Sequence, residues 1–209
     1  MVSRTQQWHI TLKALLASRQ FAPHAFSTRI LPPLVKRLRK RFPEIEIEIV
    51  ELTDEDTRRA LKDGFVDFAT LAGWEDLELE YIPLAEDRLV GLLPERHPMA
   101  KMTSVTPQDL AEEEFIMTKG GSEPLVRDWF RSKSAEPNVR HTALQLTSIL
   151  AMVRAGFGLS VVAEMAVPES HPQVSIVPLE PVQVREIYLC ARKGSFSSHA
   201  AKQVWRFLA

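Results

Sequence analysis

The sequence predicts an α/β protein of two lobes that are joined by two extended crossing segments. Strand-like and helix-like patterns alternate along residues 9–73, as they do in a parallel sheet with helices packed across it. A second alternating series occupies residues 106–165. Long extended stretches at 80–98 and 174–193 bracket that second series. The chain is therefore expected to leave one lobe, build the other and return, which creates a hinge and a cleft.

The first lobe opens with a strand, a loop, a helix and a second strand. Residues 9–17 are strand-like, and residues 18–28 form the loop. Apolar side chains recur at helical spacing in residues 30–42, and two prolines lie in the first turn of this helix, where proline is tolerated. Residues 45–52 alternate isoleucine with glutamate, which is typical of a strand near a sheet edge with one face toward water.

A second helix and a third strand complete the β-α-β-α-β order of this lobe. Thr53 starts the acidic run TDED, which is typical of a helix N-terminus, and Gly64 stands where such a helix would end. Residues 66–73 follow as a strand. The extended segment 80–98 then carries the chain out of the lobe.

The second lobe repeats the alternation. Its predicted elements are a helix at 106–113, a strand at 114–119, a helix at 123–133, a strand at 138–144, a helix at 146–156 and a strand at 158–165. The extended segment 174–193 and a helix at 197–209 return the chain to the first lobe. The predicted boundaries are 1–83 plus 182–209 for lobe I and 84–181 for lobe II.

The amino-acid composition and charge limit the classes of function that we expect for this chain. The chain has 209 residues, of which 45% are hydrophobic and 25% charged, and a formal net charge of −1 at pH 7. It lacks the broad positive field of a nucleic-acid binder. We interpret the basic cluster at 36–41 as the solvent-exposed face of the helix 30–42. Contact with phosphate groups is the alternative interpretation. No apolar stretch could span a membrane and no signal peptide is recognised, so a cytoplasmic protein is expected.

The turn Lys119-Gly120-Gly121-Ser122 is the candidate binding motif. It lies between a predicted strand and a predicted helix, where backbone N–H groups and the positive end of the helix dipole can hold an anion. The same residues are also typical of a tight turn with a serine cap. The residues of this turn are compatible with both interpretations.

Catalytic, cofactor and metal sites are not predicted. The run GFGLS at 156–160 lacks the third glycine of a dinucleotide fingerprint and follows a helix, so we interpret it as a helix stop. The six histidines are scattered without metal-ligand spacing. The single Cys190 lies in an apolar run, where a buried and inert thiol is expected. We therefore expect no enzyme, no cofactor and no metal.

Five runs of sequence, taken in order, resemble the effector-binding domain of LysR-type transcriptional regulators. They are ILPPLVKRLRKRFPEIEIEIVE, LKDGFVDFATLAG, LVGLLPERHPMA, DLAEEEFIMTKGG and ILAMVRAGFGLSVVAE. The resemblance extends from about Trp8 to Leu208. It implies a type 2 periplasmic-binding-protein-like fold, with two Rossmann-like lobes around an effector cleft. It also implies that the DNA-binding helix-turn-helix domain of such regulators is absent from this chain.

The resemblance also implies where a small organic effector, carrying a carboxylate, would bind. The implied ligand-binding residues are Ser18, Arg19, His24, Ser27, Thr53, Asp54, Lys119, Gly120, Gly121, Ser122, Gln145 and Thr147. The loop before the first helix is longer than is usual in the family, so its contact is open between Ser18, His24 and Ser27. A carboxylate at Asp54 would repel an anion unless Arg19 or another cation offsets it. Either the effector also carries a positive group, or Asp54 only caps its helix.

The resemblance implies partners as well. The subunits would form a homodimer or tetramer, side by side through the helix 30–42 and a helix of lobe II. Promoter DNA would be contacted only through the missing domain, and no membrane is involved. Two other classes share this scaffold. A transport-type solute-binding protein is disfavoured by the lack of a signal sequence, and an enzyme would need an acid–base pair or a cofactor anchor that we do not find.

Overall fold

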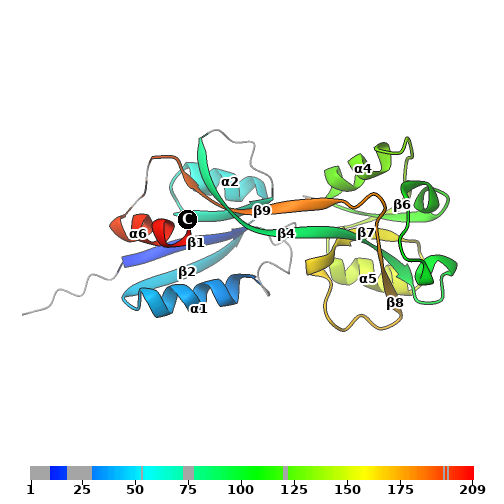
Figure 1. Ribbon diagram of the computed structural model, residues 1–209, viewed down its shortest axis with the longest axis horizontal. Coiled ribbons are helices and arrows are strands. Elements are labelled where there is room, and N and C mark those ends of the chain that lie inside the picture. Colours follow the sequence, from blue (N-terminus) through cyan, green and yellow to red (C-terminus); the bar gives the residue numbers. More distant parts are fainter. Residues whose placement is uncertain are drawn as a thin grey trace, which may run out of the picture.

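The chain folds into two groups of helices and strands, which two long strands connect (Figure 1). The connecting strands are β4 (Leu79–Pro94) and β9 (Val184–Arg192). The structure is a computed structural model that describes residues 10–17, 30–52, 54–72, 78–119, 122–194, 196 and 198–209. This mixed α/β architecture is the one that the alternating sequence patterns predict.

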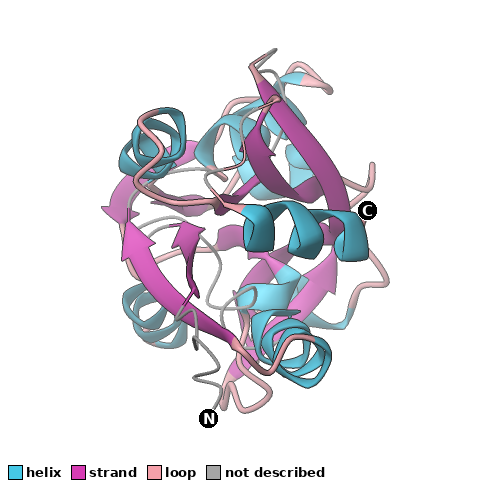
Figure 2. Ribbon diagram, turned by 90° about the vertical axis from the view of Figure 1, so that its left-hand side faces the viewer, coloured by secondary structure: helices cyan, strands magenta, loops and turns pink. Residues whose placement is uncertain are grey.

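The first group is a sheet flanked by helices. Its elements are β1 (Ile10–Ala17), α1 (Leu31–Arg41), β2 (Ile45–Leu52), α2 (Asp54–Lys62), β3 (Phe68–Ala72) and α6 (His199–Leu208). β1 lies between β2 and β3 and runs parallel to both, while β9 pairs antiparallel with β3. Seen from the end of this group, helices lie on both sides of the strands (Figure 2).

The edge strand β2 buries less apolar surface than its alternating pattern predicts. It stands at one end of the strand order, as expected. Ile45 is buried and Ile47 is half-buried, but Ile49 is 42% exposed and belongs to none of the described apolar clusters. An edge strand has a neighbour on one side only, so fewer side chains are available to cover it.

The second group follows the predicted order. Its elements are η2 (Pro98–Lys101), α3 (Pro107–Ala111), β5 (Glu114–Thr118), α4 (Glu123–Arg131), β6 (Asn138–Ala143), α5 (Leu146–Arg154), β7 (Ser160–Ala163), η3 (Glu164–Ala166) and β8 (Val174–Pro178). β5 and β6 pair in parallel. The strand predicted at 158–165 is shorter than expected, because its last residues turn into the 3-10 helix η3.

The strand β4 belongs to both groups. Its first part, residues 79–88, pairs antiparallel with β9. Its second part, residues 89–94, pairs with β7 and β8. The extended segment predicted at 80–98 is therefore a hydrogen-bonded strand over most of its length, and the backbone hydrogen bonding passes from one group to the other through it.

Each group has its own apolar core. In the second group, Phe115, Trp129 and Phe130 are fully buried and make edge-to-face ring contacts. In the first group, the rings of Phe68 and Trp205 stack with their centroids 5.8 Å apart. Truncation of such a buried aromatic side chain to alanine typically costs about 3–5 kcal/mol, so these residues fix how the helices pack on the strands.

Candidate functional site

Two helices of the second group begin side by side. The parallel strands β5 and β6 end with Thr118 opposite Ala143, and the Lys119 N–H donates to the Ala143 carbonyl at 2.9 Å. α4 follows β5, and α5 follows β6. Because the carboxyl ends of parallel strands share one edge of a sheet, both helices start from that edge, α4 with Pro124 in its first turn. We call it the α4–α5 edge. Its described candidate residues are Lys119, Ser122, Gln145 and Thr147.

The first group has a corresponding edge. β1 and β2 are in parallel register from Ile10 opposite Ile45 to Ala17 opposite Leu52. In Figure 1 both strands run from the outer end of their group toward the second group. α2 begins at Asp54, directly after β2. Ala17 and Leu52, the last residues of the two strands, therefore lie together at an edge that faces the second group.

Several of the predicted ligand-binding residues lie outside the described part of the chain. They are Ser18, Arg19, His24, Ser27, Thr53, Gly120 and Gly121. Asp54 is the first residue of α2, in the helix that the acidic run predicts, but its side chain is not described. The roles assigned to these residues stay predictions.

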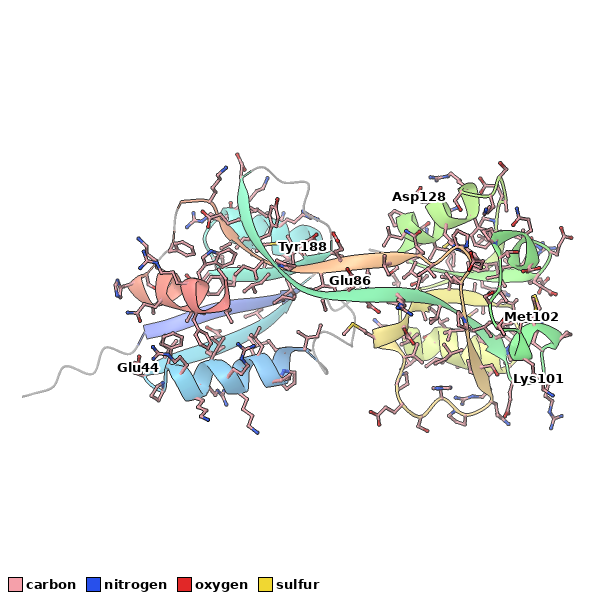
Figure 3. The ribbon with its side chains drawn as sticks, in the orientation of Figure 1. Glu44, Glu86, Lys101, Met102, Asp128 and Tyr188 are labelled. Carbon is pink, nitrogen blue, oxygen red and sulfur yellow. The ribbon has the colours of Figure 1, made fainter. Side chains whose placement is uncertain are left out.

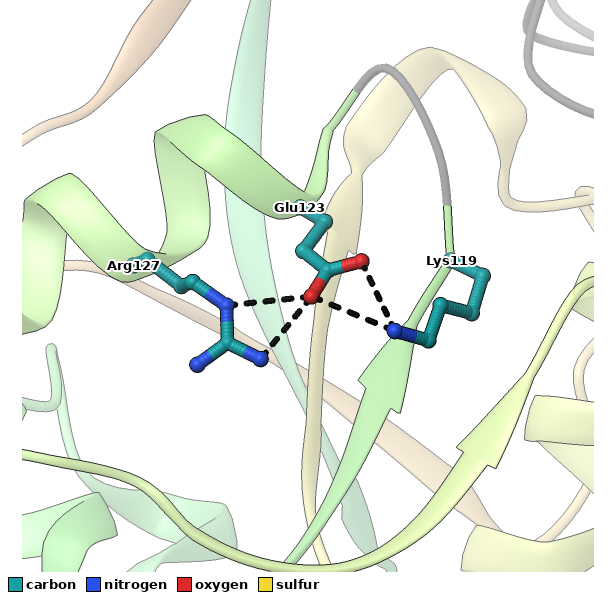
Figure 4. Close-up of polar contacts among 3 residues, drawn as sticks. All are labelled: Lys119, Glu123 and Arg127. Atoms are coloured by element: carbon teal, nitrogen blue, oxygen red, sulfur yellow. Dashed lines mark hydrogen bonds and ion pairs between the residues drawn. The ribbon is translucent and has the colours of Figure 1, made fainter.

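Lys119 is engaged in an ion-pair network at the α4–α5 edge (Figure 4). Its Nζ lies 3.3 Å from Oε2 of Glu123. Arg127 donates from Nε and Nη2 to Oε1 of the same carboxylate, at 3.0 and 2.8 Å. Lys119, which the sequence suggests as a ligand-binding cation, therefore forms an ion pair with Glu123, four residues along the chain. The Lys119 side chain is 45% exposed, so solvent weakens this pair.

Glu123 remains ionised at neutral pH. Burial raises the pKa of its carboxyl, but the hydrogen bonds and positive charges of Arg127 and Lys119 outweigh burial and hold the pKa below its usual 4.5. The two cations Lys119 and Arg127 thus pair with the single carboxylate of Glu123, so these three side chains together carry a charge of +1.

Ser122 does not cap α4 with its side chain, although it occupies the N-cap position. Its Oγ instead accepts a hydrogen bond from Nη1 of Arg185 at 3.3 Å. The expectation of a serine cap is therefore wrong, because a buried cation from β9 competes for the hydroxyl oxygen. Since arginine only donates, the Ser122 hydrogen is left to serve an acceptor.

Arg185 is held in turn by a buried ion pair on the crossing strands. Its Nε and Nη2 donate to Oδ2 of Asp87 at 3.0 and 2.5 Å, and Arg185 and Asp87 are only 4% and 1% exposed. The two residues are direct partners in the register of β4 on β9. Oδ1 of Asp87 accepts the Met165 N–H at 3.0 Å. Removal of either charge would leave the other buried and unpaired, so the pair is strongly fixed.

Sequence reasoning missed Asp87 and Arg185. They are separated by 98 positions, and their contact follows only from the pairing register of two long strands. The available signal was weak. Each extended segment carries several acids and bases, and only the strand register selects Asp87 and Arg185 from among them as partners.

The start of α5 is also uncapped. Gln145 occupies its N-cap position with an extended backbone, and the Gln145 side chain makes no capping hydrogen bond. Gln145 and Thr147 are both exposed. Two helix N-termini, neither capped by its own N-cap side chain, therefore follow neighbouring strands at the α4–α5 edge, and such termini favour anions.

The described residues show neither a metal-binding cluster nor a membrane-spanning helix. Among the residues that the structure describes, no group of three or more His, Cys, Asp or Glu side chains is placed to hold a metal ion. In the same part of the chain, no helix is long and apolar enough to cross a membrane.

Comparison with known families decides the identity. The family model described as "LysR substrate binding domain" matches residues 21–209. The chain belongs to the LysR substrate-binding domain family. The resemblance seen in the sequence is confirmed, and so is the type 2 periplasmic-binding-protein-like fold that this LysR effector-binding domain was expected to have.

Relatives of this LysR domain are transcriptional regulators. The HTH-type regulator YvbU of Bacillus subtilis is 28% identical over 178 residues, which cover 84% of this chain and 61% of that protein. The HTH-type regulator CatR of Pseudomonas putida is 30% identical over 183 residues, covering 85% of this chain and 62% of that protein. The chain thus spans less than two thirds of the length of these regulators.

Solved structures share the fold of the LysR domain. The effector binding domain of QuiR in complex with shikimate gives a TM-score of 0.82 at 23% identity, covering 96% of this chain and 95% of that one. The BenM effector binding domain with its effector benzoate gives 0.75 at 21% identity, covering 94% and 92%. At these identities the likeness establishes the architecture.

Proposed function

We propose that this chain is the effector-sensing part of a LysR-type transcriptional regulator and binds a small organic metabolite in a cleft between its two groups of elements. The observation that carries the proposal is that the uncapped starts of α4 and α5 follow two neighbouring parallel strands, whose ends the Lys119–Ala143 hydrogen bond joins. The parallel strands of the other group run toward the second group (Figure 1), so the two edges would enclose the ligand.

The chemistry of the edge favours a carboxylate-bearing effector. Backbone N–H groups at helix starts and a local charge of +1 attract an anion, and the Ser122 hydroxyl is set to donate. QuiR and BenM were solved with shikimate and benzoate, which are both carboxylates. The proposed contacts are Ser18, Arg19, His24, Ser27, Thr53 and Asp54 from the first group, and Lys119, Gly120, Gly121, Ser122, Gln145 and Thr147 from the second.

The wider assembly is proposed from the family. Lobe I would comprise residues 1–83 and 182–209, and lobe II residues 84–181. The domain would work as a homodimer or tetramer, in the cytoplasm where promoter DNA lies, and a separate N-terminal helix-turn-helix domain would contact that DNA. Its relatives are regulators rather than enzymes, which supports a sensing role without catalysis.

A screen of metabolite carboxylates tests the proposal. A ligand that binds the native state raises the unfolding temperature by mass action, and calorimetry then gives its affinity. Ser122→Ala and Thr147→Ala should each weaken binding by about 1 kcal/mol, or about fivefold, because each removes one donor.

Thr103→Ala is the matched control for these variants. Thr103 is exposed, lies just after η2, and is not part of the α4–α5 edge. Loss of the Thr103 hydroxyl should leave the affinity for the effector unchanged. If both edge variants bind as tightly as the unmodified chain, the effector does not bind at this edge.

A further inference from the structure

The buried pair Asp87–Arg185 has contacts at both ends. Arg185 uses Nε and Nη2 for Asp87 and extends Nη1 to the Ser122 hydroxyl at 3.3 Å. Asp87 uses Oδ2 for Arg185 and Oδ1 for the Met165 N–H at 3.0 Å. One ion pair on the crossing strands thus joins the start of α4 to the short helix η3.

Met165 reaches from the second group to the first. Its side chain packs against the buried cluster formed by Leu31, Val35 and Ile187. Leu31 and Val35 belong to α1, and Ile187 lies on β9 two residues after Arg185. The residue whose N–H is held by Asp87 therefore also touches the core under α1.

We infer that Asp87 and Arg185 relay the state of the proposed effector-binding turn at Ser122 to the packing of Met165 against the cluster of Leu31, Val35 and Ile187. The path runs from Ser122 through Arg185 and Asp87 to Met165, which packs against the cluster of Leu31, Val35 and Ile187. This inference rests on the proposed function, because it concerns how occupancy of that site would be passed on.

The physical basis of the relay is the burial of both charges. At 1% and 4% exposure, Asp87 and Arg185 have little water to replace a lost partner, so a displaced guanidinium must take its carboxylate with it. A ligand acceptor that takes the Ser122 hydrogen reorients the hydroxyl and so moves the oxygen that accepts from Nη1. The carboxylate then shifts against the Met165 N–H, and the Met165 side chain shifts against the cluster of Leu31, Val35 and Ile187.

A mutational experiment without ligand tests the relay. The chain has six methionines, so selective labelling of methionine methyl groups gives a simple NMR spectrum with a signal for Met165. Ser122→Ala removes the acceptor of Nη1 and should move the Met165 methyl signal by more than its line width. The same substitution in an Asp87→Asn background should leave that signal in place, because the link is already cut.

Two controls separate the relay from a general disturbance. The methyl signal of Met152, which packs in another cluster from α5, should stay fixed in every variant. Thr147→Ala removes a hydroxyl from the neighbouring helix start and should not move the Met165 signal. If Asp87→Asn does not fold, Arg185→Lys replaces it, since one ammonium cannot reproduce the fork that serves both Asp87 and Ser122.

Two results would overturn the inference: a Met165 signal that Ser122→Ala does not move, or one that moves equally in the Asp87→Asn background. The pair would then only hold the two strands together. Because no ligand is used, the outcome is independent of the metabolite screen. A working relay together with a metabolite screen that finds no ligand would count against the proposed function, and metabolite binding without a relay would count against this inference alone.

Discussion

Glu123 balances two cations at the start of α4. Lys119 and Arg127 both bind its carboxylate, so the residue that would repel an anionic ligand also fixes the cations that attract one. A neighbouring side chain is engaged as well, because the Ser122 oxygen accepts from Arg185. The α4–α5 edge is therefore organised by hydrogen bonds and ion pairs between side chains of the chain itself.

The lowered pKa of Glu123 predicts a pH-dependent contribution to stability. The folded-state pKa lies below 4.5, so the ionised side chain stabilises the fold at pH values above 4.5. This contribution should disappear as the pH falls from about 4.5 through the lower folded-state pKa. The free energy of unfolding of the unmodified chain should thus exceed that of Glu123→Gln at pH 7, and the difference should shrink toward pH 3.

Urea unfolding of both proteins between pH 7 and pH 3 measures this difference. Glu112→Gln, which changes an exposed glutamate in the second group, controls for the loss of one negative charge. A Glu123→Gln difference that stays constant across the pH range would show that the ion-pair network contributes nothing.

At the residue scale, sequence reasoning finds single residues better than pairs. Lys119 and Ser122 could be selected because they flank a glycine turn at a predicted helix start. The partner of Lys119 lies four residues away, and that spacing was available to find it. Asp87 and Arg185 could not be paired, because nothing local specifies which residue of β4 faces which residue of β9.

At the scale of elements, the junction between β5 and β7 depends on Gly158. Its φ is +140°, and a Cβ there would lie 2.5 Å from the Glu114 carbonyl oxygen. The close approach is needed because the Leu159 N–H donates to that same carbonyl at 2.8 Å. The helix stop predicted for the GFG run is confirmed, and its second glycine is explained by this packing.

Gly158→Ala should destabilise the fold by about 3 kcal/mol or more, since it adds a backbone clash to an unfavourable φ. Gly156→Ala is the matched control. Its φ is +78°, but an added methyl group there would meet no heavy atom within 4 Å beyond its chain neighbours, so a loss of about 1 kcal/mol from the backbone conformation is expected. Urea unfolding measures both losses, and equal values would contradict the role of close packing at Gly158.

Element order follows from periodicity, and element ends follow from tertiary contacts. The helices could be predicted because apolar residues such as Val126, Trp129 and Phe130 recur at helical spacing and are buried. The end of β7 could not be predicted in this way. The chain turns into η3 where Asp87 accepts the Met165 N–H, and that acceptor comes from a distant strand.

At the scale of the whole molecule, β4 and β9 are strands that the two groups share. Figure 3 shows Glu86, on β4, in the region between the two groups. Tyr188, on β9, lies at the side of the first group and packs in its core, whereas Glu44 and Met102 lie within opposite groups. A movement of one group against the other must therefore pass through these strands. The sequence predicts two crossings, but continuous pairing through β4 depends on the strand register, which no local pattern encodes.

The most direct measurement is a crystal structure of the chain with a carboxylate that the metabolite screen identifies. We expect the ligand carboxylate within hydrogen-bonding distance of the Ser122 hydroxyl and of a backbone N–H at the start of α5, with the rest of the ligand between the two groups. A ligand bound on the outer surface of either group, without contact to α4 or α5, would contradict the proposed sensor site.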